Sequence, residues 1–499
     1  MSETRQLKEK ALHQGAAQGI IEETKMTVES NLVVKNAFLE GNFCPTREEV
    51  SLPCVEVEGE IPPELEGCFL RIGPNPQFVP DVNLYHWFDG DGMIHEIQFK
   101  QGKAHYQNKW IETKGYLKEK EKGDWIWRGI NSPPDFANPD GPMKNPANTA
   151  FVWNNDRLLA LWEGGEPYEI KLPSLETVGI ENFGNKLSGY PYSAHPKVDP
   201  ETGDMIACGY FMAAPPYAKH FVVDKQGKML KETPIQLPKG IIMHDCAITK
   251  RYTVILDLPL TFDLALAMKG KKPINWEPSN GARIGLLDRQ QDTHPIQWFD
   301  INPGMVFHVM NAYEEGDEVI VEACRSNKTT MLQERMNPEE ELAFPHQWRL
   351  NLVTGEVKEQ RISKTWCEFP RINENKLGRK YRFCWASRFA GTDTPLFDAL
   401  VRFDRKTNTE TVYELGAGRY VGEAVFAPKI NPTTKEVAAE DSGWIIGFVW
   451  DENKQQSECI IMDAQDYTKG PIATLKMPVR VPYGFHTGWV GADLLSKQR

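Results

Sequence analysis

Apolar residues along this chain fall in short runs that are separated by polar turn residues. The run 149–153 is followed by the polar segment 154–157 and by a second apolar run, 158–162, which predicts strand, turn and strand. The same alternation recurs, with predicted strands at 221–223, 348–352, 400–403, 444–450 and 458–462. Helical periodicity is scarce, and short helices are expected only near the N-terminus, for instance around residues 3–15. The pattern therefore predicts an all-β protein.

Many hairpins with polar tips favour a β-propeller, because a ring of four-stranded blades hides most strand edges. No fixed-period repeat is evident in the sequence, which a divergent propeller allows. Two successive β domains are the alternative. Since no Pro- or Ser-rich linker separates two halves, we favour one domain. We predict an N-terminal extension with short helices at 1–45 and a single propeller domain at 46–499.

Composition and charge narrow the functional classes. The 57 Lys and Arg residues against 69 Asp and Glu residues give a net charge of −12, which disfavours binding to nucleic acid. The nine cysteines include no CxxC pair and therefore predict neither a zinc ribbon nor a thioredoxin-type site. The N-terminus is charged and has no signal-peptide core, and the most apolar stretch, 444–450, is too short to span a bilayer. These features predict a cytoplasmic location.

Four of the eleven histidines stand in or beside apolar runs: His195, His244, His308 and His486. For any one of them alone, a hydrogen-bonded core or turn histidine is a more common role than a metal ligand. A propeller can bring such residues together, because the innermost strand of every blade faces the common axis. Four neutral imidazoles would suit a borderline divalent metal, and iron, zinc and copper all stay open on this reasoning.

Three glutamates also stand beside apolar residues, where carboxylates are uncommon unless they are paired: Glu163, Glu368 and Glu423. Metal-bound histidines usually donate their second N–H group to a carboxylate or a carbonyl. The three glutamates are therefore candidate partners of the histidines. A surface position at the end of a strand is the alternative for each of them.

Several longer motifs contain these residues. They are the segments 65–76, 86–93, 147–150, 194–200, 243–245, 307–308, 368–373 and 480–486. With these motifs the sequence resembles the carotenoid cleavage oxygenases, a family of non-haem iron dioxygenases. The resemblance extends from Leu65 to His486 and so covers most of the chain.

The resemblance implies a seven-bladed β-propeller with capping loops and short helices over one face. It implies iron(II) on the propeller axis, with His195, His244, His308 and His486 as its ligands. Glu163, Glu368 and Glu423 would hold His244, His308 and His486 respectively, and His195 would have no carboxylate partner. Thr149 would lie near an open coordination position and shape oxygen access, although a plain strand role is equally compatible with its sequence context.

The implied reaction is the addition of O₂ across one conjugated C=C bond of a carotenoid or apocarotenoid, which yields two carbonyl products. No residue is expected to act as a general acid or base. An apolar tunnel would hold the polyene, and Phe211 and Phe262 are the candidate tunnel residues. The apolar segment around Phe262 is followed by Lys269, Lys271 and Lys272, so residues 259–272 are the expected contact with a membrane. A short helix packed on the propeller is the alternative for this segment.

Three other functions stay open. A stilbenoid cleaver on the same scaffold would hold a phenol with a Tyr and a Lys, and that Lys aligns directly before Glu163. This position is Trp162, which disfavours stilbenoids. An isomerase of the same family is the second alternative. The third is a non-enzymatic binding propeller, which would have no need for this set of histidines and glutamates.

Overall fold

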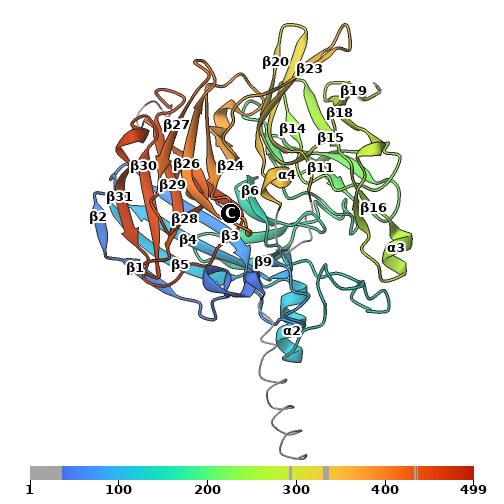
Figure 1. Ribbon diagram of the computed structural model, residues 1–499. Helices are drawn as coiled ribbons and strands as arrows, with labels where there is room; N and C mark the ends of the chain where they lie inside the picture. Colours follow the sequence, from blue (N-terminus) through green and yellow to red (C-terminus); the bar gives the residue numbers. More distant parts are fainter. Residues whose placement is uncertain (1–35, 292–294, 330–336, 432–433, 435–436, 499) are drawn as a thin grey trace, which may run out of the picture.

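The computed structural model describes residues 36–291, 295–329, 337–431, 434 and 437–498. In these residues β-strands dominate, and they form seven four-stranded blades (Figure 1). Five blades are separate sheets, and the remaining two are joined in one nine-stranded sheet by a single residue pair between β26 and β28. The predicted all-β propeller is therefore confirmed. The helix expected around residues 3–15 lies outside the described residues.

The blades follow one another along the chain. The first contains β3 (Gly67–Pro74), β4 (Gly92–Lys100), β5 (Lys103–Trp110) and, outermost, β1 (Ser51–Cys54). The second contains β6 (Ala150–Asn154), β7 (Arg157–Leu161), β8 (Tyr168–Lys171) and β9 (Glu176–Ile180). The third contains β10 (Lys197–Val198), β11 (Met205–Tyr210), β12 (Ala218–Val223) and β13 (Met229–Ile235). The fourth contains β14 (Ala247–Ile248), β15 (Tyr252–Asp257), β18 (Ala282–Asp288) and β19 (Gln297–Ile301).

The last three blades repeat this order. The fifth contains β20 (Met305–Glu315), β21 (Glu318–Ser326), β22 (Phe344–Asn351) and β23 (Val357–Arg361). The sixth contains β24 (Cys367–Ile372), β25 (Phe383–Phe389), β26 (Phe397–Asp404) and β27 (Thr409–Glu414). The seventh contains β28 (Arg419–Pro428), β29 (Gly443–Asp451), β30 (Gln456–Asp463) and β31 (Pro471–Lys476). All seven runs that the sequence predicts as strands overlap observed strands, namely β6, β7, β12, β22, β26, β29 and β30.

Two strands from the chain ends close the ring. The C-terminal strand β32 (Thr487–Gly491) pairs with β3, and the N-terminal strand β2 (Val57–Gly59) pairs with β31 of the last blade. Gly67 marks the meeting of β3 and β32, because its φ is +149° and a Cβ there would lie 2.4 Å from the Val490 carbonyl oxygen. Only glycine fits such a backbone. Ring closure therefore depends on residues that lie at opposite ends of the sequence.

Helices are short and lie between the strands. They are α2 (Lys114–Lys122), α3 (Leu264–Met268), α4 (Pro338–Glu341), α5 (Ala492–Leu495), and the 3-10 turns η1 (Ala37–Leu39), η2 (Gly41–Phe43), η3 (Trp87–Asp89), η4 (Pro278–Asn280), η5 (Glu374–Lys376) and η6 (Tyr467–Lys469). A small hairpin of β16 (Leu260–Phe262) and β17 (Ile274–Trp276) carries α3. Within the described residues no helix is long and apolar enough to cross a membrane. The predicted division at residues 45 and 46 stays a prediction.

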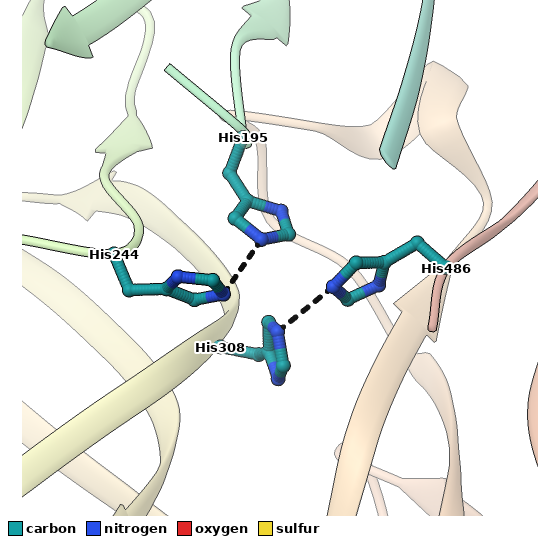
Figure 2. Close-up of side chains that lie close together, drawn as sticks. All are labelled: His195, His244, His308 and His486. Carbon is teal, nitrogen blue, oxygen red and sulfur yellow. Dashed lines mark hydrogen bonds between the residues drawn. The ribbon is translucent and has the colours of Figure 1, made fainter. Parts of the chain in front are cut away.

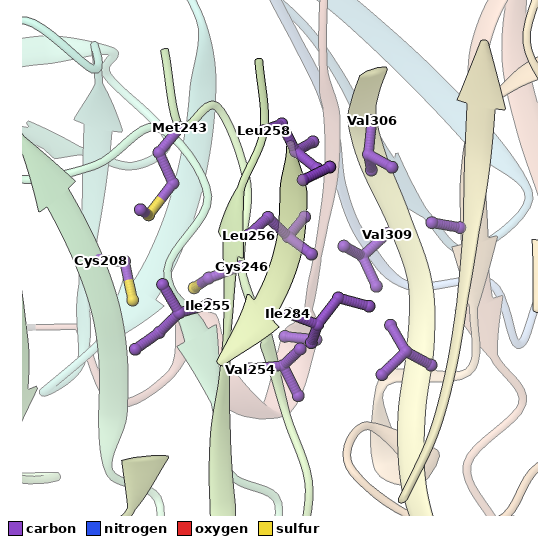
Figure 3. Packing of buried hydrophobic residues seen from close by; sticks show 14 of the residues in the cluster. Cys208, Met243, Cys246, Val254, Ile255, Leu256, Leu258, Ile284, Val306 and Val309 are labelled. Atoms are coloured by element: carbon purple, nitrogen blue, oxygen red, sulfur yellow. The ribbon is translucent and has the colours of Figure 1, made fainter. Parts of the chain in front are cut away.

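The core lies between neighbouring blades, and Figure 3 shows it for the third, fourth and fifth blades. Successive residues of β15 point to opposite faces, with Ile255 toward Cys208 of the third blade and Leu256 toward Val306 of the fifth. Because both faces are buried, β15 reads as a continuous apolar run rather than as an alternating one. Packing of this kind holds each blade at a set angle to the next.

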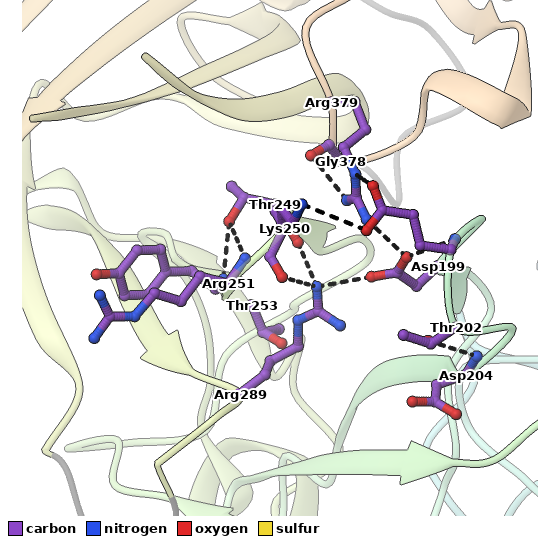
Figure 4. A network of polar contacts seen from close by, with 12 residues as sticks. Asp199, Thr202, Asp204, Thr249, Lys250, Arg251, Thr253, Arg289, Gly378 and Arg379 are labelled. Atoms are coloured by element: carbon purple, nitrogen blue, oxygen red, sulfur yellow. Dashed lines mark hydrogen bonds and ion pairs between the residues drawn. The ribbon is translucent and has the colours of Figure 1, made fainter. Parts of the chain in front are cut away.

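A polar network ties the third, fourth and sixth blades together near the ends of the innermost strands β10 and β14 (Figure 4). Asp199, which follows β10, accepts from Arg289 of the fourth blade at 3.0 Å and from Arg379 of the sixth blade at 2.9 Å. Arg289 also donates to the backbone carbonyl of Lys250 at 2.9 Å. Asp199 is almost fully buried, so these ion pairs are shielded from solvent. Apolar packing between neighbouring blades and the buried ion pairs of Asp199 therefore both fix how these blades are arranged.

Candidate metal centre

The four histidines predicted from the sequence meet on the propeller axis. His195 and His244 precede β10 and β14, His308 lies within β20, and His486 directly precedes β32. His195, His244 and His308 therefore stand at or in the innermost strands of the third, fourth and fifth blades, and His486 stands before the ring-closing strand β32, beside β3 of the first blade. Their ligand nitrogens all lie within 4.8 Å of one another, and the rings point toward one centre (Figure 2).

Three of the rings are oriented by carboxylates. The Nδ1 of His244 contacts Glu163, that of His308 lies 2.5 Å from Glu368, and that of His486 lies 3.1 Å from Glu423. A carboxylate only accepts, so each Nδ1 carries the proton and donates. The Nε2 of each ring is consequently an unprotonated lone-pair donor. In the described part of the chain no carboxylate lies within ion-pair distance of His195.

The inward-facing nitrogens create a site that can hold a cation. His308 Nε2 lies 3.1 Å from His486 Nε2, and His195 Nε2 lies 3.0 Å from His244 Nε2. Two lone pairs at this distance repel each other unless a positive ion lies between them. Metal–nitrogen bonds of about 2.1 Å at right angles would place adjacent donors roughly 3.0 Å apart, in agreement with both spacings. The residues present therefore fit one divalent metal ion.

The electrostatics favour the ligand-competent forms of two histidines. Burial, together with the other three rings, lowers the pKa of His195 well below its usual range. Burial also lowers the pKa of His486 to about 4, although Glu423 opposes this shift. For Glu423 itself, burial raises the pKa, but the charges of Arg371 and His486 outweigh it and the pKa falls to about 2. These shifts favour neutral imidazoles at His195 and His486 and an ionised carboxylate at Glu423.

β-Bulges shape the strands that carry the centre. The register shifts between Val306 and Val309 in β20, between Glu368 and Arg371 in β24, and between Val421 and Ala424 in β28. A regular strand would send adjacent side chains to opposite faces, whereas a bulge re-aims them. As a result, the adjacent residues Phe307 and His308 both line the same cavity. The same holds for Glu368 and Phe369 in β24.

Phe369 has a strained backbone at this position. Its φ is +55°, a conformation that non-glycine residues rarely adopt. Its ring stacks on His308 with centroids 5.4 Å apart and meets His486 edge-on at 5.3 Å. Such strain persists where the surroundings impose it, as commonly happens at functional sites.

An apolar cavity of about 230 Å³ opens onto the histidines. Aromatic side chains dominate its lining, namely Phe38, Trp87, Phe88, Trp162, Phe307, Phe369, Phe389, Phe397 and Phe485. Among the described residues of this lining there is no lysine, arginine or tyrosine. The cavity thus suits a flat or extended apolar molecule next to the metal position.

The residues predicted to control access lie in different places. Thr149 lines the cavity, and its carbonyl oxygen accepts from the His486 amide at 3.3 Å. Phe211 is 42% exposed and packs against Tyr190, away from the cavity. Phe262 lies in β16, and among the described lining residues none comes from 259–272. The access roles of all three residues stay predictions.

The aromatic lining was not foreseen as a group. Trp162, Phe307, Phe369 and Phe485 each stand next to a predicted metal-site residue in the sequence. That adjacency was the available signal. Regular strand alternation predicts that each aromatic residue faces away from its metal-site neighbour. The bulges that change this are evident only from the pairing register of the strands.

Comparisons with known proteins agree with this geometry. The sequence model of the family described as retinal pigment epithelial membrane protein, RPE65, matches residues 43–491. Carotenoid 9,10(9',10')-cleavage dioxygenase 1 of Pisum sativum is 35% identical, over 92% of this chain and 91% of its own length.

Solved structures share the architecture. The lignostilbene dioxygenase of Pseudomonas brassicacearum superposes with a TM-score of 0.84 at 27% identity, covering 92% of this chain and 99% of that protein. The cobalt-substituted apocarotenoid oxygenase of Synechocystis gives a TM-score of 0.80 at 29% identity, covering 90% and 97%.

Proposed function

Because the chain belongs to the retinal pigment epithelial membrane protein family, together with carotenoid cleavage dioxygenases, we propose that it is an iron(II) dioxygenase of polyenes. It would cleave one conjugated C=C bond of a carotenoid or apocarotenoid with O₂ and release two carbonyl products. Both oxygen atoms enter the products and no proton is transferred. The reaction therefore needs no general acid or base.

The observation that carries this proposal is the direct opening of an aromatic cavity onto the four-histidine centre, of which His244, His308 and His486 line the cavity. Iron(II) held by His195, His244, His308 and His486 would supply the site at which O₂ is activated. The chain itself excludes water from this place with Phe307, Phe369 and Phe485. Glu163, Glu368 and Glu423 hold three rings in the tautomer that presents Nε2 inward.

The same cavity favours polyenes over phenolic stilbenoids. A polyene needs only apolar contacts, which the aromatic side chains of the lining offer. A phenol hydroxyl needs a polar partner, for which the described lining residues offer Asn148, Ser326, Thr329 and Glu341 but no lysine, arginine or tyrosine. Trp162 lies on the wall next to Glu163 and offers no ammonium group. The similarity to a lignostilbene dioxygenase makes stilbenoid cleavage the second candidate.

Product analysis distinguishes the two candidates. Iron-loaded protein is incubated under ¹⁸O₂ with β-carotene, an apocarotenal or resveratrol, and the products are identified by mass spectrometry. We expect each polyene that reacts to yield two carbonyl fragments with one ¹⁸O each, and resveratrol to stay intact. Metal-stripped protein is the control. Cleavage of resveratrol alone would select the second candidate.

The substrate's low solubility in water suggests a peripheral membrane contact, which we propose for residues 259–272. The helix α3 in this segment exposes Leu264 and Met268, the latter by 72%, and Lys269, Lys271 and Lys272 are exposed behind it. Lysines near an anionic lipid surface contribute about 1 kcal/mol each. Co-sedimentation with phosphatidylserine-containing vesicles is therefore expected, and Met268→Glu should weaken it several-fold.

Val353 supplies the matched control for this experiment. It is 75% exposed in the turn after β22, outside 259–272. Val353→Glu should leave vesicle binding unchanged. Equal binding by all three proteins would place any membrane contact elsewhere on the molecule.

A further inference from the structure

One buried carboxylate, Asp245, touches three of the strands that carry the histidines. It directly follows His244 and is only 4% exposed. Asp245 is distinct from the three glutamates that orient the rings. It is also absent from the described residues that line the cavity. Its contacts are therefore with the scaffold of the metal centre rather than with the rings or the cavity.

Each oxygen of Asp245 binds a different part of that scaffold. Oδ1 accepts the amide of Cys246 at 2.7 Å, which fixes the chain just after His244. Oδ2 accepts the amide of Val309, the residue after His308, at 2.8 Å. The Lys197 ammonium lies 2.6 Å from Oδ1. Lys197 is two residues beyond His195, so three ligand-bearing segments converge on this carboxylate.

The β20 bulge explains why the Val309 amide is used in this way. The strand register is irregular on both sides of Val309, where the chain turns Phe307 and His308 toward the cavity. A buried amide at such an irregularity needs an acceptor, because a buried donor left unpaired is destabilising. Asp245 provides the acceptor from the neighbouring blade. The position of His308 is thus coupled to that of His244.

Lys197 extends the same coupling to His195. The His195 ring has no carboxylate within ion-pair distance among the described residues, unlike the other three. Lys197 begins β10, two residues after His195, so a contact to Lys197 acts on the segment that carries this ring. Its ion pair is largely shielded, with side-chain exposures of 15% for Lys197 and 2% for Asp245. Cys246 adds a contact from its Sγ to the His195 carbonyl oxygen at 3.9 Å.

We propose that Asp245 and Lys197 form a brace that sets the spacing of His195, His244 and His308. The inference rests on the proposed metal centre. The two are positioning residues, since they act on the backbone of the ligands. The glutamates determine the orientation of three rings. The brace determines the spacing of the backbone segments that carry His195, His244 and His308. His486 is tied separately, because Glu423 accepts both its ring and the Thr487 hydroxyl, the latter at 2.8 Å.

The test must separate positioning from simple charge. Asp245→Asn leaves the Lys197 cation unpaired near the metal, so repulsion alone would weaken metal binding. The double variant Lys197→Met with Asp245→Asn restores the wild-type net charge but not the ion pair. It also leaves no unpaired buried charge, so it is the variant to use if Asp245→Asn alone does not fold.

Cobalt(II) provides the readout, since a relative has been obtained in cobalt-substituted form. Cobalt affinity is measured by competition with a chelator, and the visible ligand-field spectrum reports ligand geometry. We expect both variants to bind cobalt at least about tenfold more weakly than wild type, with an altered spectrum. Apo-protein melting curves check that each variant is folded.

A matched control comes from the third blade, which also carries Lys197. Lys219 on β12 is 17% exposed at its side chain and pairs with Glu232, away from the axis. Lys219→Met with Glu232→Gln should leave cobalt affinity and spectrum unchanged. If the double variant Lys197→Met with Asp245→Asn had the cobalt affinity and spectrum of the wild type, the effect of Asp245→Asn would be one of charge alone. That result would overturn the inference. A wild-type protein that binds no cobalt would instead overturn the metal centre itself.

Discussion

Replacement of His308 by alanine is expected to abolish polyene cleavage and to strip the protein of its metal. His308 supplies one of the four lone-pair nitrogens, and its ring packs against both His486 and Phe369. The loss should exceed the roughly 10–100-fold that removal of a ligand's hydrogen-bond partner costs. Glu368 would in addition keep a buried charge without its ring partner. Elemental analysis and product formation measure the two effects.

His220 is the matched control for this variant. It is also buried, but it lies in β12 and is hydrogen-bonded to Thr253 at 3.0 Å, outside the metal centre. His220→Ala should lower the melting temperature without loss of metal per folded protein. If His308→Ala retained both metal and full activity, the proposed centre would be wrong.

Substitution of Glu423 by glutamine should weaken metal binding and activity by about 10–100-fold. Glu423 accepts with both oxygens, from His486 on one side and from the Thr487 hydroxyl on the other. A glutamine offers one oxygen and one NH₂ group, so one of these donors would face another donor. The Arg371 guanidinium, 3.7 Å from Glu423, would also lose part of its charge compensation.

Glu458 provides the comparison for this second variant. It is similarly buried and pairs with Arg419 in the seventh blade, away from the histidines. Glu458→Gln should cost stability to a comparable degree and leave metal affinity unchanged. Titration of apo protein with iron(II) or cobalt(II), beside thermal unfolding, separates the two effects. Equal metal affinity in both variants would mean that Glu423 serves stability alone.

Much of the fold could be predicted because its signals are local. Short apolar runs with polar tips, such as 444–450 and 458–462, are visible in the sequence and lie in β29 and β30. The closure of the ring could not be read from the sequence. It depends on β2 pairing with β31 and on β32 pairing with β3, and no local pattern specifies partners so distant along the chain.

For the candidate site as well, one part could be predicted from the sequence and another part could not. Its donor types were evident, since His195, His244, His308 and His486 interrupt apolar runs. The aromatic cavity wall was missed because bulges in β20 and β24 break the alternation on which strand interpretation rests. The Asp245–Lys197 pair could not be predicted although both residues lie in the motifs 194–200 and 243–245, because an ion pair between two blades leaves no periodic trace in the sequence.

The sequence by itself determined the strand-rich class and the chemistry on offer: neutral nitrogen donors, carboxylates to orient them and aromatic neighbours. The tertiary structure decided which of these groups meet. His308 and His486 are 178 residues apart, yet their Nε2 atoms lie 3.1 Å from each other because the ring closes through its last strand. The physical reason is that residue type is a local property, whereas convergence on one axis requires every blade to be packed at its proper angle.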